Sequence, residues 1–414
     1  MKSPRFANRR IKILRVIGRL NVGGATVHVV NLCAGLNRGR FDQLLVVGSE
    51  NRAEGSMLDY AVARGVQPHV IPEIVTTFSL APRDLKALVK LYFLMRRERP
   101  HIVCTETAKA GFLGRLAARL AGVPVIVHTF HGHVLHGYYG PLKNWLMRRM
   151  ERSLAGFTDR LVAVSEEVKR DLVGYGVAAE RKIAVIPLGI DLEPFLNSHS
   201  HKGEFRRELA LGNGIKLVGI VGRIFPIKNH RLFLQSAARI SAQEPGVRFV
   251  IVGDGVLRST VEQQARQLGI ADSVLFTGWR RDLPTIYADL DILVVSSDNE
   301  GTPVSAIEAM AASCPVVATR VGGLPDLIDD RRTGRLVPPR DEKALADAVL
   351  DLLRRPEMAR DLERNAKESV GKRFAVTRLI NDMEHFYRGL LEEKQIALST
   401  AVSVDARGIA RRPF

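Results

Sequence analysis

Two cations in the second half of the chain have the types and spacing to hold a diphosphate. Arg223 and Lys228 share a short segment with Gly222 and Pro226. A guanidinium group contacts two phosphate oxygens at once, and an ammonium group adds a compact charge. The segment follows a strand that we expect at residues 216–221, and open α/β sheets place ligands at the carboxyl ends of strands. Taken alone, the pair fits two solvated surface cations better.

Two carboxylates form a second candidate cluster. Glu300 and Glu308 lie in segment 298–309, directly after an apolar strand expected at residues 291–295. A carboxylate accepts two hydrogen bonds, which suits the hydroxyl groups of a sugar and of ribose. The alternative interpretation makes Glu300 a partner of a helix dipole and Glu308 a solvated helix residue.

The residues between these glutamates predict the start of a helix. Thr302 is expected to cap it and Pro303 to be its first residue. Gly301 lets a ligand approach closely, and the free N–H groups at such a helix end attract an anion. Carboxylates and free donors are therefore expected to face one cleft.

Three histidines follow a strand expected at residues 125–128 in the first half of the chain. Of these, His128 is expected to face inward from the strand, and His131 to lie in the cleft. An imidazole ring can donate or accept a hydrogen bond, so His131 can orient an acceptor or stabilise a developing cation. A metal site formed with His133 is the alternative, but no carboxylate or cysteine accompanies the histidines at close spacing.

A further pair, Asp289 and Asp291, matches the Asp-x-Asp pattern of metal-dependent transferases. The pair follows a helical segment and opens an apolar strand, so we interpret it as structural. We expect no metal cofactor at either position.

Two successive sets of strands and helices are expected, one in each half of the chain, and they position these residues. Short β-branched runs alternate with longer segments of helical period, which is typical of parallel sheets covered by helices. In the first half, strands are expected at residues 11–17, 44–47, 69–71, 101–104, 125–128, 160–164 and 183–186, and helices at 26–36, 82–99, 110–121, 142–154 and 166–173. In the second half, strands are expected at 216–221, 248–252, 274–276, 291–295 and 316–318. Each half is therefore expected to be a doubly wound α/β domain.

Domain boundaries follow from composition. Residues 192–214 are polar without a periodic apolar face, so we expect a linker there. Residues 1–191 then form a first domain, and residues 215–394 form a second domain closed by carboxyl-terminal helices. Residues 395–414 are expected to be a flexible tail.

The net charge of +17 is concentrated in the first half. Residues 1–190 contain 29 Lys and Arg against 14 Asp and Glu, a difference of +15. Segments 82–97 and 142–152 mix basic and large apolar residues at helical spacing, as interfacial helices do, although core-facing helices look the same. We expect peripheral binding to an anionic membrane.

Other sequence features indicate the cellular compartment and exclude some classes of protein. No apolar run approaches the roughly 20 residues of a membrane-spanning helix, and the basic amino terminus does not continue as a signal peptide. The three cysteines are far apart and form no CxxC pair, which favours reduced thiols in the cytoplasm. The chain has no zinc spacing, recognised module or aromatic-basic interleaving, so we expect no nucleic-acid partner.

The order of these motifs resembles the family 4 retaining glycosyltransferases of GT-B fold. That family has a glutamate pair eight positions apart after a Gly-Arg…Lys loop, as at residues 300–308 and 222–228 here. Segments 23–24, 163–166 and 186–191 also match in order and spacing. The resemblance covers roughly residues 11–390 and implies two Rossmann-like domains that face each other across a cleft.

The resemblance also implies roles for individual residues. Arg223 and Lys228 would bind the diphosphate of a nucleotide-sugar donor, Glu308 its ribose, and Glu300 with the backbone of residues 301–303 the transferred sugar. Gly24 would approach the phosphate from the first domain. His131 occupies the place of the family's active-site histidine. The cations and a helix end would replace a metal at the leaving diphosphate.

The expected reaction is transfer to a hydroxyl acceptor on a lipid-linked or membrane-borne glycan, in polysaccharide or glycolipid biosynthesis at the inner face of the plasma membrane. Because no residue is marked as a nucleophile on the opposite face of the sugar, the resemblance implies front-face transfer with retention. The alternative is a nucleotide-sugar epimerase of the same fold.

Overall fold

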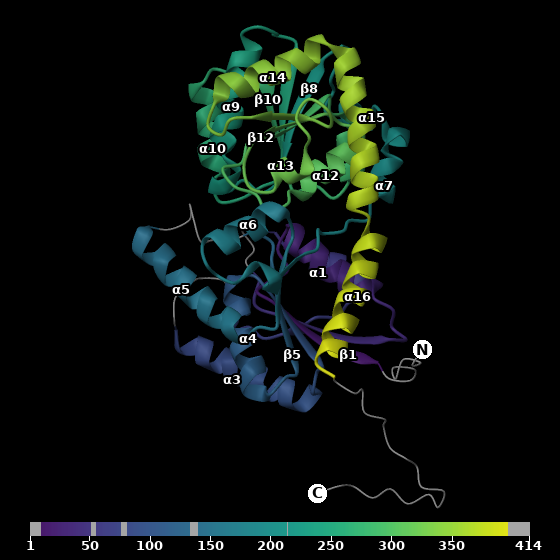
Figure 1. Ribbon diagram of the computed structural model, residues 1–414. Helices are drawn as coiled ribbons and strands as arrows, with labels where there is room; N and C mark the ends of the chain where they lie inside the picture. Colours follow the sequence, from purple (N-terminus) through teal and green to yellow (C-terminus); the bar gives the residue numbers. More distant parts are fainter. Residues whose placement is uncertain (1–9, 51–54, 76–80, 133–139, 213, 396–414) are drawn as a thin grey trace, which may run out of the picture.

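The computed structural model describes residues 10–50, 55–75, 81–132, 140–212 and 214–395, and it contains two α/β domains (Figure 1). The sheet of the first domain has seven parallel strands in the order β3-β2-β1-β4-β5-β6-β7. They are β1 (Ile11–Ile17), β2 (Phe41–Val47), β3 (His69–Val70), β4 (Ile102–Glu106), β5 (Val125–Phe130), β6 (Arg160–Ala163) and β7 (Ile183–Val185).

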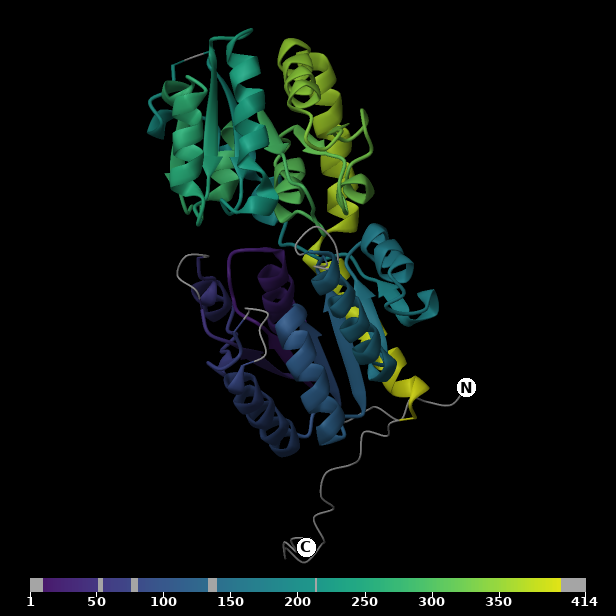
Figure 2. The ribbon, with the colours of Figure 1, turned by 90° about the vertical axis from the view of Figure 1, so that its left-hand side faces the viewer.

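Helices cover both faces of this sheet: α1 (Gly24–Gly35), α2 (Leu58–Ala63), α3 (Pro82–Glu98), α4 (Ala108–Ala121), α5 (Pro141–Phe157) and α6 (Glu166–Gly174). One apolar cluster joins α3 and α4 to the sheet, and another joins α1 to it. When the molecule is turned, α3, α4 and α5 are seen on one side of the sheet (Figure 2). The burial of strand residues on both faces explains their nearly continuous apolar composition.

The second domain has a six-stranded parallel sheet in the order β10-β9-β8-β11-β12-β13. Its strands are β8 (Lys216–Val221), β9 (Val247–Val252), β10 (Val274–Gly278), β11 (Ile292–Val295), β12 (Val316–Thr319) and β13 (Arg335–Val337). The helices are α9 (His230–Ser241), α10 (Arg258–Gln267), α11 (Leu283–Asp289), α12 (Val304–Ala311), α13 (Leu324–Leu327), α14 (Glu342–Arg354) and α15 (Pro356–Arg373). The order reverses between β8 and β11, so the loops after these two strands open side by side.

Both sheets confirm the expected fold of two doubly wound domains. Most predicted elements differ from the observed ones by a few residues at their ends, whereas α2 and β13 were not predicted. Among the described residues, no helix combines the length and the apolar character that a membrane span requires. The three cysteines are unpaired; Cys104 and Cys314 are buried, and Cys33 is only partly so.

The prediction of a linker at residues 192–214 is wrong. The described part of this segment contains α7 (Glu193–Leu196) and α8 (Glu204–Glu208), and the side chains of Phe195 and Phe205 lie in the core of the second domain. The segment is mostly polar and its apolar residues are widely spaced, so the sequence shows no periodic apolar face. The segment is therefore a structural part of the second domain.

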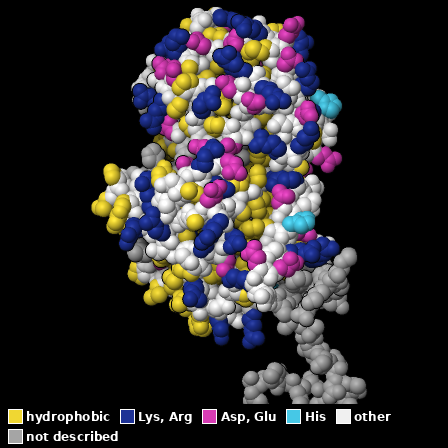
Figure 3. All heavy atoms as spheres, in the orientation of Figure 1, with side chains coloured by type: hydrophobic (Ala, Val, Ile, Leu, Met, Phe, Trp, Pro, Cys, Tyr) yellow, Lys and Arg dark blue, Asp and Glu magenta, His cyan; other side chains and the backbone are white. Residues whose placement is uncertain are grey.

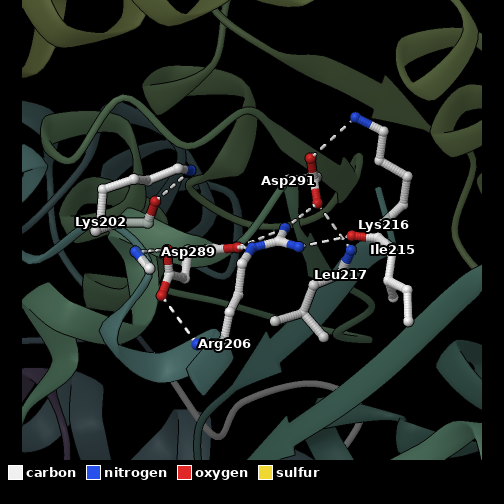
Figure 4. Close-up of polar contacts among 9 residues, drawn as sticks. Lys202, Arg206, Ile215, Lys216, Leu217, Asp289 and Asp291 are labelled. Carbon is white, nitrogen blue, oxygen red and sulfur yellow. Dashed lines mark hydrogen bonds and ion pairs between the residues drawn. The ribbon is translucent and has the colours of Figure 1, made fainter. Parts of the chain in front are cut away.

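Polar contacts fix the same segment in place (Figure 4). The backbone N–H of Arg206 donates to the Asp289 carboxylate at 3.0 Å, and its guanidinium group donates to Asp291 at 2.5 Å. Asp291 also accepts from the backbone N–H of Leu217 at 2.8 Å and lies 3.3 Å from Nζ of Lys216. The Asp-x-Asp pair thus joins α8 to the start of β8, in agreement with its structural interpretation.

The helix α16 (Val376–Glu393) returns to the first domain, although it was expected to close the second. Leu379, Met383 and Tyr387 lie in the same apolar cluster as Ile13 of β1. An amphipathic period predicts a helix but does not reveal which domain it covers, which explains the error. The chain therefore crosses between the domains twice (Figure 1). Of the expected tail at 395–414, residues 396–414 lie outside the described residues.

Candidate active site

A cavity of about 500 Å³ lies between the two domains, at the carboxyl ends of their strands. Each domain contributes loops that follow strands at its switch point, β1 in the first and β8 and β11 in the second. All nine residues that the sequence singled out line this cavity: Gly24, His131, Arg223, Lys228, Glu300, Gly301, Thr302, Pro303 and Glu308. The fold therefore brings together side chains that lie far apart in the sequence.

Lys228 and Glu300 meet in an ion pair, with Nζ 2.5 Å from Oε1. The Ser297 hydroxyl donates to the same carboxylate oxygen at 2.6 Å. The two loops are joined below the pair, because the Ser296 hydroxyl donates to the carbonyl oxygens of Lys228 and Asn229. A cation and a carboxylate are thus held together at the switch point.

Arg223 lines the cavity beside this pair, and its guanidinium carbon lies 5.6 Å from the centre of the Phe225 ring. The loop that carries it rests directly on a neighbouring glycine turn. A Cβ on Gly253 would lie 2.0 Å from the carbonyl oxygen of Gly222, and one on Gly255 would lie 2.4 Å from that of Ile224. Both glycines also have positive φ angles, of 132° and 157°. Glycine is therefore needed at both positions to support the Arg223 loop.

Glu308 lies deeper in the site, on α12, where it is 8% exposed. It accepts a hydrogen bond of 3.0 Å from the Tyr287 hydroxyl. Burial raises the pKa of Glu308 to about 8, and the hydrogen bond from Tyr287 offsets part of this rise. At neutral pH the carboxyl group is therefore largely protonated, and it can both donate to and accept from ligand hydroxyls.

The start of α12 differs from the prediction. The helix begins at Val304, and Pro303 is the N-cap, with an extended backbone (ψ 112°). Thr302 does not cap the helix, because its hydroxyl donates to the carbonyl oxygen of Val164 in the first domain, at 3.3 Å. The Thr302 side chain, which was expected to cap α12, thus bridges the two domains.

Close contacts between backbones bring the domains together over the cavity. A Cβ on Gly301 would lie 1.9 Å from the carbonyl oxygen of His131, and one on Gly24 would lie 3.0 Å from Cγ2 of Val304. The glutamate loop therefore touches the histidine loop directly. The first turn of α1, which begins at Gly24, lies opposite the start of α12.

His131 is held by residues that the sequence analysis missed. Its Nε2 lies 2.7 Å from Oε2 of Glu106, the last residue of β4. Oε1 of Glu106 lies 3.8 Å from the guanidinium group of Arg15 on β1, and both side chains are fully buried. The ring of His28 packs edge-on against His131, with 4.9 Å between ring centres. An acidic residue at the end of a strand was the signal that could have identified Glu106.

His28, Glu106 and His131 also form a group that could hold a metal ion, since their ligand atoms lie within 4.8 Å of one another. The buried guanidinium group of Arg15 already compensates the charge of Glu106 and would repel a cation. We therefore regard the group as a hydrogen-bonded His131–Glu106 pair against which the His28 ring packs.

The other two histidines of the motif are not part of this cluster. His128 is buried and forms a 2.8 Å hydrogen bond with the Thr105 hydroxyl, which confirms that it faces inward. Burial lowers the pKa of His128 well below its usual range. His133 lies outside the described residues.

Comparison with known proteins agrees with this architecture. The model of Glycosyltransferase Family 4 matches residues 22–194, and that of Glycosyl transferases group 1 matches residues 201–369. The Escherichia coli UDP-Gal:alpha-D-GlcNAc-diphosphoundecaprenol alpha-1,3-galactosyltransferase is 28% identical over 381 residues, which cover 89% of this chain and 97% of that protein. The D-inositol 3-phosphate glycosyltransferase of Segniliparus rotundus is 32% identical over 306 residues, which cover 71% of this chain and 67% of that protein.

A solved structure shares the fold over nearly the whole chain. HepE of Anabaena, in complex with UDP and glucose, superposes with a TM-score of 0.79 at 22% identity, covering 92% of this chain and 100% of its own. Both family models describe transferases, so nothing here supports the epimerase alternative. The chain belongs to the family 4 glycosyltransferases and is a nucleotide-sugar-dependent transferase of GT-B fold.

Proposed function

We propose that this chain is a retaining glycosyltransferase that transfers a sugar from a nucleotide-diphosphate-sugar to a hydroxyl group of a lipid-linked or membrane-borne glycan. The observation that carries the proposal is the position of the Lys228–Glu300 ion pair in the cavity that His131 lines from the other domain. Charges for a diphosphate and acceptors for sugar hydroxyls thus share one cleft with a histidine.

The donor is proposed to bind mainly to the second domain. Arg223 and Lys228 bind the diphosphate, and Glu308, which can donate and accept, binds the ribose hydroxyls. Glu300 and the backbone of residues 301–303 bind the sugar to be transferred. Gly24 approaches the phosphate from the start of α1, where the helix has no acidic residue in its first turn. The two cations stabilise the leaving diphosphate without a metal.

The transfer step is proposed to occur on one face of the sugar. The leaving diphosphate helps to remove the proton of the acceptor hydroxyl, which then forms the new bond on the side from which the diphosphate departs. His131 orients the acceptor, or it stabilises the cationic sugar after the diphosphate departs and before the new bond forms. The contact of Gly301 with the His131 backbone closes the cleft and keeps water from the cation.

The acceptor is proposed to be carried by a lipid. The Escherichia coli relative is named for a diphosphoundecaprenol-linked acceptor, and the Staphylococcus aureus relative CapM is named for capsular polysaccharide biosynthesis. We propose the same kind of acceptor for this chain, and therefore a role in cell-surface polysaccharide or glycolipid biosynthesis.

A membrane-facing surface on the first domain supports this acceptor. On α5, Leu142, Trp145 and Leu146 are 80%, 57% and 57% exposed, and Arg149 lies over the Trp145 ring at 5.7 Å. Their spacing places these apolar side chains on one stripe of the helix. In the space-filling view, hydrophobic and basic side chains gather on the left side of the lower domain, over α5 (Figure 3).

The same composition continues on α3, where Leu85, Val89 and Phe93 are 65%, 44% and 64% exposed. Lys86 and Lys90 flank this stripe. We propose that α3 and α5 bind an anionic membrane, with apolar side chains in the interface and cations at the headgroups. We propose on this basis that the enzyme acts as a peripheral protein at the inner face of the plasma membrane.

Donor binding tests the proposal first. A thermal-shift screen against UDP-, GDP- and ADP-sugars is expected to identify a stabilising donor, and both Arg223→Ala and Glu308→Ala are expected to abolish the shift. Arg354→Ala removes an exposed arginine that pairs with Glu244 on the far side of the same domain, and should leave the shift unchanged. NMR of the product then tests retention, since inversion at the anomeric carbon would contradict front-face transfer.

A further inference from the structure

A buried chain of polar side chains connects α16 to the cleft within the first domain. The guanidinium group of Arg15 donates to the Tyr387 hydroxyl at 2.9 Å and lies 3.8 Å from Glu106. Glu106 in turn lies 2.7 Å from Nε2 of His131. The register of β1 and β4 pairs Arg15 with Cys104, so Glu106 lies two residues farther along the neighbouring strand.

The charge of Arg15 decides which groups donate in this chain. A carboxylate in such a buried place is stable only beside a cation, and Arg15 is that cation. An ionised carboxylate only accepts hydrogen bonds, so Nε2 of His131 must carry the hydrogen and donate it. In a neutral imidazole ring, Nδ1 then has the free lone pair. Nδ1 of His131 is buried and, among the described residues, has no hydrogen-bond partner.

Packing against His28 also fixes the orientation of the His131 ring. The His28 ring stands edge-on to that of His131, at 73° between planes, and is itself buried. Burial holds the pKa of His28 well below its usual range, and the neighbouring His131 acts in the same direction, so His28 adds no charge. His131 is therefore held between a neutral ring and one carboxylate.

We propose that Glu106 is a positioning residue, which fixes the orientation of the His131 ring at the cleft and its tautomer, with hydrogen on Nε2 and a lone pair on the buried Nδ1. The guanidinium group of Arg15 lies 3.8 Å from Glu106 on its other side, and the Tyr387 hydroxyl of α16 accepts a hydrogen bond from Arg15. The catalytic consequence rests on the proposed role of His131, whereas the tautomer itself does not depend on that role.

The variant Glu106→Gln tests this assignment in the full-length protein. Arg15 can only donate, so the amide oxygen of the glutamine turns toward Arg15 and its NH₂ group toward His131. Nε2 must then accept, and the hydrogen moves to Nδ1. In ¹⁵N-histidine NMR, the His131 signal, assigned by its loss in His131→Ala, is expected to change from the Nε2–H to the Nδ1–H pattern. We expect kcat to fall about 100-fold, with donor KM within about threefold of wild type.

Asp84→Asn is the matched control, because Asp84 is a buried carboxylate 2.6 Å from the buried Lys109 of the same domain and does not line the cleft. It should lower the melting temperature to a similar degree while kcat and the His131 signal stay as in wild type. An unchanged His131 signal in Glu106→Gln would overturn the proposal, as would an equal loss of kcat in Asp84→Asn. Loss of wild-type activity on chelation, restored by Zn²⁺, would overturn it in favour of a metal site. Because the NMR measurement needs no substrate, failure of the transferase proposal leaves it interpretable.

Discussion

Lys228 and Glu300 neutralise each other inside the cleft, although they lie 72 positions apart in the sequence. This pair brings the proposed phosphate-binding cation to the proposed sugar-binding carboxylate before any donor arrives. In the proposed donor complex, Lys228 turns to the diphosphate while Glu300 keeps its hydrogen bond from Ser297, so donor binding exchanges one partner of Lys228 for another. Glu300 is therefore expected to compete with an incoming diphosphate for Lys228.

Glu300→Gln should therefore separate nucleotide binding from transfer. A neutral amide competes less for Lys228, so a nucleoside diphosphate alone is expected to bind as tightly as to wild type, or up to about tenfold more tightly. Turnover is expected to fall about 100-fold or more, because the contacts of the carboxylate with the transferred sugar are weakened. Calorimetric titration with the nucleoside diphosphate and a transfer assay measure the two effects.

Glu262→Gln is a suitable control for this experiment, because Glu262 forms a 2.8 Å ion pair with Arg258 on α10, outside the cleft. It should change neither quantity. Weaker binding of the nucleoside diphosphate in Glu300→Gln, comparable with that in Lys228→Ala, would show that the ion pair does not restrain the cation.

Glu308 makes stability depend on pH in a specific direction. Burial raises its pKa to about 8 in the folded protein, from an ordinary value of 4.5. Between these values the folded carboxyl group holds a proton that the unfolded one has lost, so this group makes the free energy of unfolding fall as pH rises from about 5 to 8. Glu308→Gln removes this contribution.

Urea denaturation of the donor-free protein at several pH values checks this prediction. The stability of Glu308→Gln relative to wild type should rise by roughly 3 kcal/mol or more between pH 5 and pH 8. Glu262→Gln should track wild type throughout. A constant difference between Glu308→Gln and wild type across this range would mean that the carboxyl group ionises normally.

The two sheets and the position of the cavity were predictable because both depend on local patterns. The strand at residues 216–221 was predicted with its observed ends, since an uninterrupted apolar run is bounded there by Gly222. The loops with Lys228 and Glu300 meet because they follow adjacent strands at a switch point, which the alternation of strands and helices already indicates.

Long-range partners were not predictable in the same way. Arg15 interrupts the apolar run of β1 with a charge, yet it is fully buried, because Tyr387 of α16 and Glu106 of β4 lie against it. Which strand is the neighbour, and to which domain the last helix returns, are decided by tertiary packing. The hydrogen bond from His131 to Glu106 depends on both, so the sequence identified the histidine but not its carboxylate.

Membrane binding is expected to depend on the exposed side of α5. Replacing Trp145 and Leu146 together by serine removes two large side chains from the interface, each of which contributes about 1.5–3 kcal/mol when fully buried. The fraction of protein that sediments with anionic vesicles at low salt should fall severalfold. Catalysis with a soluble acceptor analogue should be unchanged.

Val256→Ser is the corresponding control, since Val256 is 55% exposed on the second domain. It should sediment as wild type does. If the wild-type protein does not bind anionic vesicles at low salt, the membrane proposal fails while the donor-binding proposal stands.

Gly301 is expected to be indispensable for turnover, although it has no side chain that could take part in the chemistry. A Cβ at this position would lie 1.9 Å from the carbonyl oxygen of His131 and 2.9 Å from the N of Gly132, both backbone atoms that cannot move aside alone. Gly301→Ala must therefore push the glutamate loop away from the histidine loop. Because reacting groups misplaced by about 1 Å lose about 100-fold in rate, turnover should fall by at least that factor.

Gly371→Ala gives the matched control, because no heavy atom lies within 4 Å of the added Cβ on α15. It should retain full turnover and gain up to about 1 kcal/mol of stability, as expected for glycine replaced by alanine within a helix. Gly301→Ala should still bind the nucleoside diphosphate, whose proposed cationic ligands lie on the second domain, while small-angle scattering should show a larger radius of gyration. Equal turnover in the two variants would mean that the domains need not touch at Gly301 during transfer. A turnover loss confined to Gly301→Ala would show that the reacting geometry requires the Gly301–His131 contact.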